Sequence, residues 1–262
     1  MSADACGSCA VANLANLQRL GLQVEQGEVV VALTGNPNTG KSTVFNMLTG
    51  LRQHVGNWPG TTVTRAEGAY RSGGAVHRVV DLPGTYSLLS TSSDEDAARD
   101  FLLFGDPDVT VVVVDATRLE RNLNLVLQVL QITDRVVVAL NMMDEAARHG
   151  VRLDVRHLER ELEVPVVPMS ARRGEGVSEL LEAIASTAAG TTVGRSRPLR
   201  LPASVAAAVD LLAGRLAMEF AGLSNVRWVA LRLLEGDASI TDALVDGRLG
   251  DLDAAMRCRK AS

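Results

Sequence analysis

GNPNTGKST, the stretch from Gly35 to Thr43, decides how the rest of this chain is organised. It matches the pattern G-x-x-x-x-G-K-[ST], with Lys41 and Ser42 at its last two positions. A β-branched apolar run precedes it at 28–34 and a helical pattern follows it at 44–48. The stretch is therefore predicted to be a phosphate-binding loop (P-loop) that joins a strand to a helix.

Each position of this loop has an expected role. Backbone N–H groups would converge on phosphate oxygens, Lys41 would neutralise the β and γ phosphates, and the Ser42 hydroxyl would ligate Mg²⁺. The alternative is a glycine-rich turn that matches the pattern by chance. The residues expected to contact the nucleotide here are Gly35, Asn36, Asn38, Thr39, Gly40, Lys41, Ser42 and Thr43.

The sequence next predicts a segment that closes over the nucleotide. Residues 50–60, GLRQHVGNWPG, are rich in turn formers, so we expect a mobile loop that exposes Trp58. In guanine-nucleotide-binding proteins, a Thr near such a loop ligates Mg²⁺ through its side chain and positions the attacking water through its carbonyl. We assign this role to Thr62, with Thr61 as the second choice.

A second segment of the same kind follows two predicted strands at 63–71 and 75–81. Asp81-Leu82-Pro83-Gly84 is D-x-x-G at a strand end, about 40 residues after the P-loop. Asp81 would hold Mg²⁺ through water, and the Gly84 N–H would contact the γ-phosphate. Residues 85–98 are polar and are expected to order when that phosphate is present.

Three further strands, at 109–115, 136–140 and 164–168, alternate with helical patterns at 122–132 and 177–185. Asn141-Met142-Met143-Asp144 follows the second of these strands. Asp144 there would accept hydrogen bonds from guanine N1 and N2, which adenine cannot provide, so GTP is favoured over ATP. After the third strand, the Ala171 N–H would meet guanine O6 while Ser170 tightens the turn.

Composition limits the class of protein. With 262 residues, 47% of them hydrophobic, the chain can bury one large core and a smaller second one. Its net charge of -5 and its scattered basic residues argue against nucleic acid as a main partner. The apolar run at 109–114 is too short to span a bilayer, and the N-terminus lacks the features of a signal peptide. A cytoplasmic chain is expected.

The cysteines do not indicate one function. Cys6 and Cys9 form a C-x-x-C pair, which is either a metal-binding or redox pair or two free thiols in a disordered tail. A composition break at 190–198 suggests a linker. We expect an N-terminal tail at 1–27, an α/β nucleotide domain at 28–190 and a small helical subdomain at 191–262.

Five strings, GNPNTGKST, VGNWPGTTV, DLPGTYSL, NMMDEA and RWVALRLLEGD, resemble the N-terminal cytosolic G domain and helical spacer of FeoB-type ferrous iron transporters over residues 28–237. The resemblance implies a Ras-like P-loop GTPase fold, α/β with a mostly parallel six-stranded sheet, followed by a small all-α subdomain. It also implies slow GTP hydrolysis at the cytoplasmic face of the bacterial inner membrane, coupled to Fe²⁺ passage through a membrane-embedded permease domain, and leaves an oligomer possible.

The chain departs from the Ras pattern at two residues, Thr85 and Met142. Thr85 replaces the water-orienting Gln after D-x-x-G, so intrinsic hydrolysis should be slow. Similarity to potassium-activated GTPases points to Asn38 as a K⁺ ligand, with backbone carbonyls around Gly56 to Trp58, and K⁺ would replace an arginine finger. Asn38 as a simple turn residue is the alternative. Met142 replaces Lys and would pack against the base.

The predicted catalytic residues are thus Asn38, Lys41, Thr62 and Gly84. Two other functions stay open. A soluble TRAFAC-type regulatory GTPase would use the same domain on RNA or ribosomes, although it would need a basic surface. A nucleotide-dependent contact module would bind GTP without useful hydrolysis.

Overall fold

The computed structural model describes residues 17–18, 20–50, 53–58, 62–89, 92–191, 201–220, 223 and 225–245. The chain divides into two compact units. The sheet unit comprises Gln23–Leu102 and Pro107–Arg197, and the helical unit comprises Met1–Leu22, Leu103–Asp106 and Pro198–Ser262.

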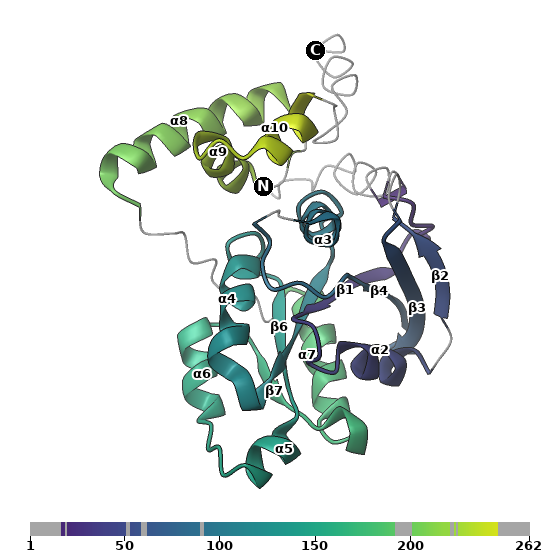
Figure 1. Ribbon diagram of the computed structural model, residues 1–262. Helices are drawn as coiled ribbons and strands as arrows, with labels where there is room; N and C mark the ends of the chain where they lie inside the picture. The colour runs from purple at the N-terminus through teal and green to yellow at the C-terminus, as the bar shows by residue number, and fades with distance from the viewer. Residues whose placement is uncertain are drawn as a thin grey trace, which may run out of the picture. The chain divides into compact units, whose positions relative to one another are not determined.

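One seven-stranded sheet, in the order β2-β3-β4-β1-β5-β6-β7, forms the sheet unit (Figure 1). Strands β4, β1, β5, β6 and β7 are parallel neighbours, whereas β2, β3 and β4 pair antiparallel. The sheet is mostly parallel, as predicted. The strands are β1 (Val29–Gly35), β2 (Gln53–Asn57), β3 (Thr64–Ser72), β4 (Ala75–Asp81), β5 (Val109–Asp115), β6 (Val136–Asn141) and β7 (Val166–Pro168).

The central strands are buried because helices cover both faces of the sheet. All residues of β5 and β6 are buried. Alternate residues such as Val31, Leu33 and Val113 pack with α2 and α7 in one core cluster, while α4 packs against β5 and β6. The helices of this part are α2 (Lys41–Thr49), α3 (Ser93–Phe104), α4 (Leu119–Leu130), α5 (Met143–Arg148), α6 (Val155–Leu162) and α7 (Val177–Ala188), with short 3₁₀ turns η1 (Ala116–Arg118) and η2 (Ala171–Arg173).

The expectations of six strands and of an exposed Trp58 were wrong. Residues 53–57 form an edge strand, β2, that pairs antiparallel with β3. Trp58, only 3% exposed, packs edge-on against Phe101 with ring centroids 5.5 Å apart. The Arg65 guanidinium lies 5.3 Å from the Trp58 ring centroid. Local turn formers suggested a loop, but pairing with β3 and burial of a large aromatic ring decide the conformation.

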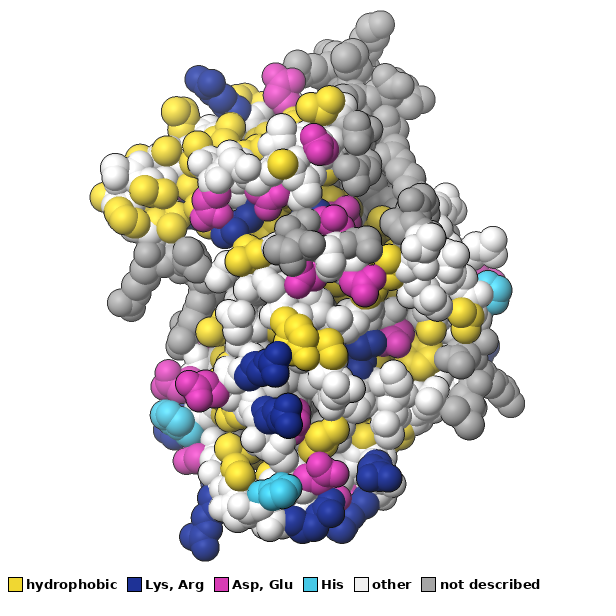
Figure 2. Space-filling view, in the orientation of Figure 1, with side chains coloured by type: hydrophobic (Ala, Val, Ile, Leu, Met, Phe, Trp, Pro, Cys, Tyr) yellow, Lys and Arg dark blue, Asp and Glu magenta, His cyan; other side chains and the backbone are white. Residues whose placement is uncertain are grey.

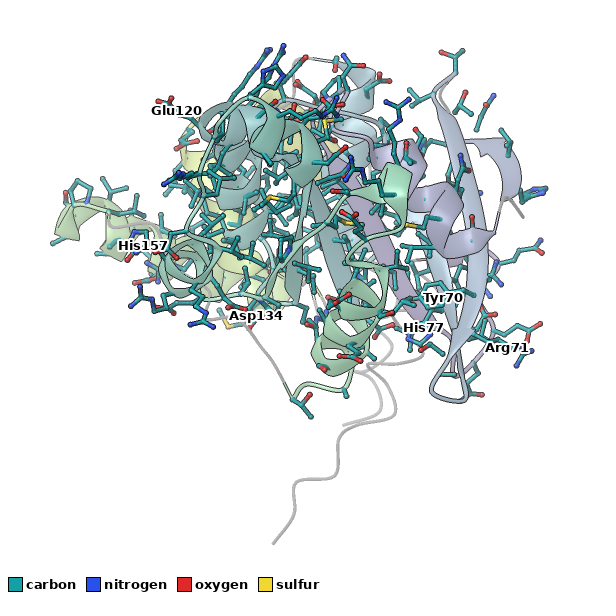
Figure 3. The ribbon with its side chains drawn as sticks, turned by 90° about the horizontal axis from the view of Figure 1, so that it is seen from below. Tyr70, Arg71, His77, Glu120, Asp134 and His157 are labelled. Carbon is teal, nitrogen blue, oxygen red and sulfur yellow. The ribbon has the colours of Figure 1, made fainter. Side chains whose placement is uncertain are left out.

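The hairpin of β3 and β4 carries an aromatic pair. Tyr70 and His77 lie directly opposite one another in the ladder. Their rings stack with centroids 4.8 Å apart and planes inclined by 8°, and Figure 3 shows them side by side. His77 is buried, in contrast to the three other histidines of the chain, His54, His149 and His157.

The helical unit contains α8 (Ala203–Glu219), α9 (Val226–Leu234) and α10 (Ala238–Val245). α8 and α9 pack together through buried residues that include Val209, Leu216 and Trp228. These three helices agree with the small all-α subdomain expected from the sequence. Among the described residues, no helix has the length and apolar character to cross a membrane.

Candidate nucleotide-binding site

The P-loop connects the end of β1 to the start of α2, as its sequence predicts. Asn38 and Gly40 adopt left-handed backbone conformations, with φ of 67° and 82°. α2 has no side-chain cap at its N-terminus. The Thr43 N–H donates to the Gly40 carbonyl at 2.9 Å, so the N–H groups of Lys41 and Ser42 are the ones available to an anion, and the helix dipole favours one there.

Two positions of this loop require glycine for lack of space. A Cβ on Gly35 would lie 2.6 Å from the Val113 carbonyl oxygen, and a Cβ on Gly40 would lie 2.4 Å from Asn141 Nδ2. Val113 belongs to β5, which pairs with β1, and Asn141 ends β6, which pairs with β5. The loop is thus fitted closely to the strand ends, and its shape does not depend on a ligand alone.

Lys41, at the start of α2, contacts the carboxylate of Asp81 at the end of β4. Burial raises the pKa of Asp81, and the charge and hydrogen bond of Lys41 partly oppose this rise. Ser42 is exposed beside Lys41. The partly buried carboxylate of Asp81 and the exposed hydroxyl of Ser42 offer the hard oxygen ligands that Mg²⁺ prefers. The residues present therefore fit the predicted metal.

Asn141, at the end of β6, joins the P-loop to the loop after β7. Its Nδ2 donates to the Thr39 carbonyl at 2.9 Å, and its Oδ1 accepts from the Ala171 N–H at 2.9 Å. The side chain is 3% exposed, so both bonds are shielded from water. The Ala171 N–H, which we expected to meet guanine O6, here binds Asn141 instead.

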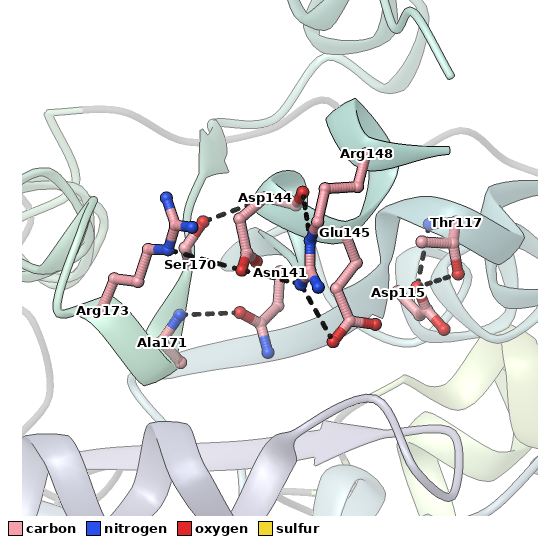
Figure 4. Close-up of polar contacts among 9 residues, drawn as sticks. All are labelled: Asp115, Thr117, Asn141, Asp144, Glu145, Arg148, Ser170, Ala171 and Arg173. Carbon is pink, nitrogen blue, oxygen red and sulfur yellow. Dashed lines mark hydrogen bonds and ion pairs between the residues drawn. The ribbon is translucent and has the colours of Figure 1, made fainter. Parts of the chain in front are cut away.

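Asp144 lies beside this junction in the first turn of α5 (Figure 4). Its N–H donates to Ser170 Oγ at 3.2 Å, which places both predicted base-site residues together. Its carboxylate forms ion pairs with Arg148 at 3.2 Å and with Arg173 at 3.5 Å. Met142 caps α5 with φ of 64°. The five predicted residues of the base site, Asn141, Met142, Asp144, Ser170 and Ala171, are thus neighbours in space.

Arg148 and Arg173 were not among the predicted site residues. Arg148 lies four residues after Asp144 in α5, a spacing that could have indicated the pair. No local signal indicates Arg173, which comes from η2. Both arginine side chains are more than half exposed, so the ion pairs are weak and a ligand can displace them.

Gly84 and Thr85 lie beside the P-loop. A Cβ on Gly84 would be 3.6 Å from Pro37, and the Thr85 N–H donates to the Gly35 carbonyl at 3.3 Å. Thr85 is 3% exposed, and its hydroxyl contacts Ser87 O and Glu95 Oε1. The hydroxyl is therefore engaged within the protein.

Thr62 is exposed just before β3, and Thr61 lies outside the described residues. Ala66 of β3 lies opposite Asp81 of β4, and Asn57 lies opposite Thr64. Because β3 runs antiparallel to both neighbours, Thr62 and Trp58 lie at the end of the sheet where β4 ends, past the level of Asp81. Gly56, expected in a free loop, is instead paired with Arg65 within β2.

The described residues do not form an iron-binding cluster. Within the described ranges, no group of three or more His, Cys, Asp or Glu side chains is placed to hold a metal ion. Cys6 and Cys9 lie outside the described residues. A metal or redox role of this pair stays a prediction.

Comparisons with known proteins agree with this geometry. The family model described as "Ferrous iron transport protein B" matches residues 29–184. The Fe(2+) transporter FeoB of Salmonella typhimurium is 45% identical over 217 residues, which make up 80% of this chain and 27% of that protein. The chain thus spans about a quarter of the length of such relatives.

Solved structures show the same likeness. The cytosolic domain of L. pneumophila FeoB is 34% identical with a TM-score of 0.75, covering 83% of this chain and 85% of that one. The cytosolic domain of the T. maritima FeoB iron transporter in a GDP form is 37% identical with a TM-score of 0.74, covering 84% and 86%. The Ras-like fold with a helical region is thereby shown.

Proposed function

The chain belongs to the ferrous iron transport protein B family, and from this premise we propose that residues 28–190 bind GTP and hydrolyse it slowly to GDP and phosphate. The observation that carries the proposal is the Asn141 junction, which joins the P-loop to the base-site loop through two hydrogen bonds. The GDP form of the T. maritima relative supports nucleotide binding. Residues 191–262 form the helical spacer of this proposal.

The phosphate half of the site has these roles. The open N-terminus of α2 and Lys41 hold the phosphates, with Gly35, Gly40 and Thr43 shaping the loop. Ser42, Thr62 and Asp81 would hold Mg²⁺, directly or through water. When bound, Mg²⁺ neutralises charge that develops on the phosphate oxygens. Gly84, already placed against Pro37, would donate its N–H to the γ-phosphate.

The base half selects guanine. The carboxylate of Asp144 would accept hydrogen bonds from N1 and N2, displacing the exposed Arg148 and Arg173 from these oxygens. Met142 would pack against the base. An adenine would leave the partly buried carboxylate without donors, which favours GTP.

Hydrolysis is proposed to be slow and stimulated by K⁺. The Thr85 hydroxyl is held by Ser87 and Glu95, so it does not replace a water-orienting glutamine. Asn38 is exposed in a left-handed conformation on the P-loop, and its amide oxygen is a suitable cation ligand. A cation at this position would add positive charge near the leaving phosphate, with the carbonyls of Gly56 and Trp58 as candidate co-ligands.

The test compares GTP hydrolysis in KCl and in NaCl at equal ionic strength. We expect hydrolysis to be faster in KCl by about tenfold or more, because one correctly placed charge contributes on that order. Asn38→Ala should remove the difference while it leaves GDP affinity within about twofold. Equal rates in both salts would refute the potassium site and leave the GTPase intact, whereas absence of any hydrolysis would favour a contact module.

The proposed transport role rests on the part of the relatives that this chain does not match. Since the relatives are Fe(2+) transporters about four times as long, we propose that a membrane permease domain is the partner and that the nucleotide state gates Fe(II) passage from the cytoplasmic face. A regulatory GTPase acting on RNA would need a basic surface. On the face drawn in Figure 2, Lys and Arg side chains are interspersed with Asp and Glu, so this face does not offer such a basic surface.

A further inference from the structure

The segment that follows the D-x-x-G motif, residues 85–89, is anchored at its start by strand β1. The Thr85 N–H donates to the Gly35 carbonyl, which continues the pairing of Leu82 N–H with the Leu33 carbonyl at 2.9 Å. These two bonds carry the backbone along the end of β1. They bring Gly84 to the P-loop but do not hold the residues after Thr85.

Helix α4 holds those residues. Gln128 Oε1 accepts from the Leu88 N–H at 2.6 Å and from Ser87 Oγ at 3.3 Å. Arg121 places its guanidinium 4.3 Å from the Tyr86 ring centroid. Arg121 and Gln128 are seven residues apart, about two helical turns, so they lie on one face of α4.

The two contacts differ in strength. Tyr86 is 43% exposed, so its contact with Arg121 is open to water and is weak. Leu88 is only 1% exposed. Removing the Gln128 oxygen would therefore leave a buried N–H without this partner, and the segment would have to move to satisfy it.

The helix behind Gln128 is a rigid support. Leu125, Val126 and Val129 of α4 are fully buried, and the helix packs on the central strands β5 and β6. A side chain on such an element is held more closely than one on a loop. Gln128 can thus fix the position of residues that lie 40 positions earlier in the chain.

From these contacts we infer that Gln128 is a positioning residue that holds residues 87–88 so that Gly84 stays beside Pro37, ready to meet the γ-phosphate. The inference rests on the proposed GTPase function and adds to it a residue outside the recognised motifs. Because GDP has no γ-phosphate, its binding does not need Gly84 in place. Loss of the tether should therefore weaken GTP binding selectively.

Two substitutions separate the acceptor oxygen from the shape of the side chain. Gln128→Met keeps the length and helix propensity but has no strong acceptor, whereas Gln128→Glu keeps an acceptor oxygen. Asn124→Ala, at an exposed residue between Arg121 and Gln128 on the same helix, is the matched control. Affinities for fluorescent GDP and for a fluorescent non-hydrolysable GTP analogue are measured for each protein.

Gln128→Met should weaken the GTP analogue by about three- to tenfold, the effect of one hydrogen bond, and leave GDP within about twofold. Gln128→Glu should recover most of the affinity, and Asn124→Ala should resemble the wild type. Without nucleotide, the Leu88 amide should exchange with deuterium faster in Gln128→Met than in Gln128→Glu.

Two results would overturn the inference: an unchanged ratio of the two affinities in Gln128→Met, whether or not both affinities fall, or a Gln128→Glu variant that behaves like Gln128→Met. If the wild-type chain bound neither nucleotide, the proposed function itself would fail. The exchange rate of the Leu88 amide would still show whether Gln128 holds the segment.

Discussion

At the residue scale, the carboxylate of Asp144 can bind either two arginine side chains or, in the proposed complex, the N–H donors of guanine. Its Oδ2 forms ion pairs with Arg148 and Arg173, both of which are exposed. Guanine would offer two N–H donors to the same carboxylate, and a ligand held in the site outweighs two solvent-exposed ion pairs. In the proposed site, base specificity therefore depends on the Asp144 carboxylate being an acceptor only.

Asp144→Asn tests that dependence. The amide would offer a donor to the exocyclic N2 group of guanine, so we expect GDP affinity to fall by about 100-fold or more, the effect of two lost bonds to a charged group. Xanthine carries a carbonyl oxygen at that position and can accept from the amide. Xanthosine diphosphate should thus bind the variant more tightly than the wild type.

Asp134→Asn, a loop substitution away from the strand ends that carry the site, is the control for loss of charge and should change neither affinity. Competition of each diphosphate against fluorescent GDP measures both proteins. If Asp144→Asn kept its preference for guanine, Asp144 would not be the recognition group.

At the element scale, α8 carries a glycine in its interior that the fold does not need. Gly214 lies within Ala203–Glu219, its backbone is not in the left-handed region, and a Cβ there would meet no atom within 4 Å. Alanine at such a position reduces the conformational freedom of the unfolded chain and favours helix.

Gly214→Ala should therefore stabilise the helical unit by about 0.5–1 kcal/mol. Urea unfolding followed by circular dichroism measures the change. Gly35→Ala is the contrasting variant, since its Cβ would lie 2.6 Å from the Val113 carbonyl oxygen, and it should be destabilised. A destabilised Gly214→Ala would mean that α8 is not the regular helix described.

Elements could be predicted from sequence where local pattern and tertiary environment agree. β5 and β6 are continuous apolar runs between covered faces, and both were predicted. β2 was missed because QHVGN has weak strand propensity and is stabilised by pairing with β3.

The residues of the candidate site likewise fall into those that the sequence predicts and those that it does not. The motif residues at strand ends could be predicted because spacing fixes them. Arg173 and Gln128 could not, since each acts on a residue that is distant in sequence, Asp144 and Leu88 respectively. Such contacts depend on how loops and helices pack, which a linear motif does not encode.

At the scale of the whole molecule, stability should depend on pH through a few buried groups with opposing effects. Burial lowers the pKa of His77, although a backbone hydrogen bond at Ala75 and the charge of Asp108 oppose it. The pKa of Asp81 is raised by burial, so this carboxyl contributes stability as pH falls. Burial acts to raise the pKa of Glu28, but its hydrogen bonds and ion pair with Arg78 prevail, and the pKa is lowered. The stability that ionised Glu28 contributes is therefore lost only in acid, as pH falls below about 4.5.

His77→Gln isolates the first of these effects. Below its unfolded pKa of about 6.5, the unfolded chain binds a proton at His77 that the folded chain resists, so stability falls as pH falls. For one proton this slope cannot exceed about 1.4 kcal/mol per pH unit. The free energy of unfolding in urea should thus decrease from pH 7.5 to 5.5 in the wild type, and decrease less in His77→Gln. His157→Gln, at an exposed histidine, should keep the wild-type decrease. An equal decrease in wild type and His77→Gln would show that the His77 ring, stacked on Tyr70, does not resist protonation.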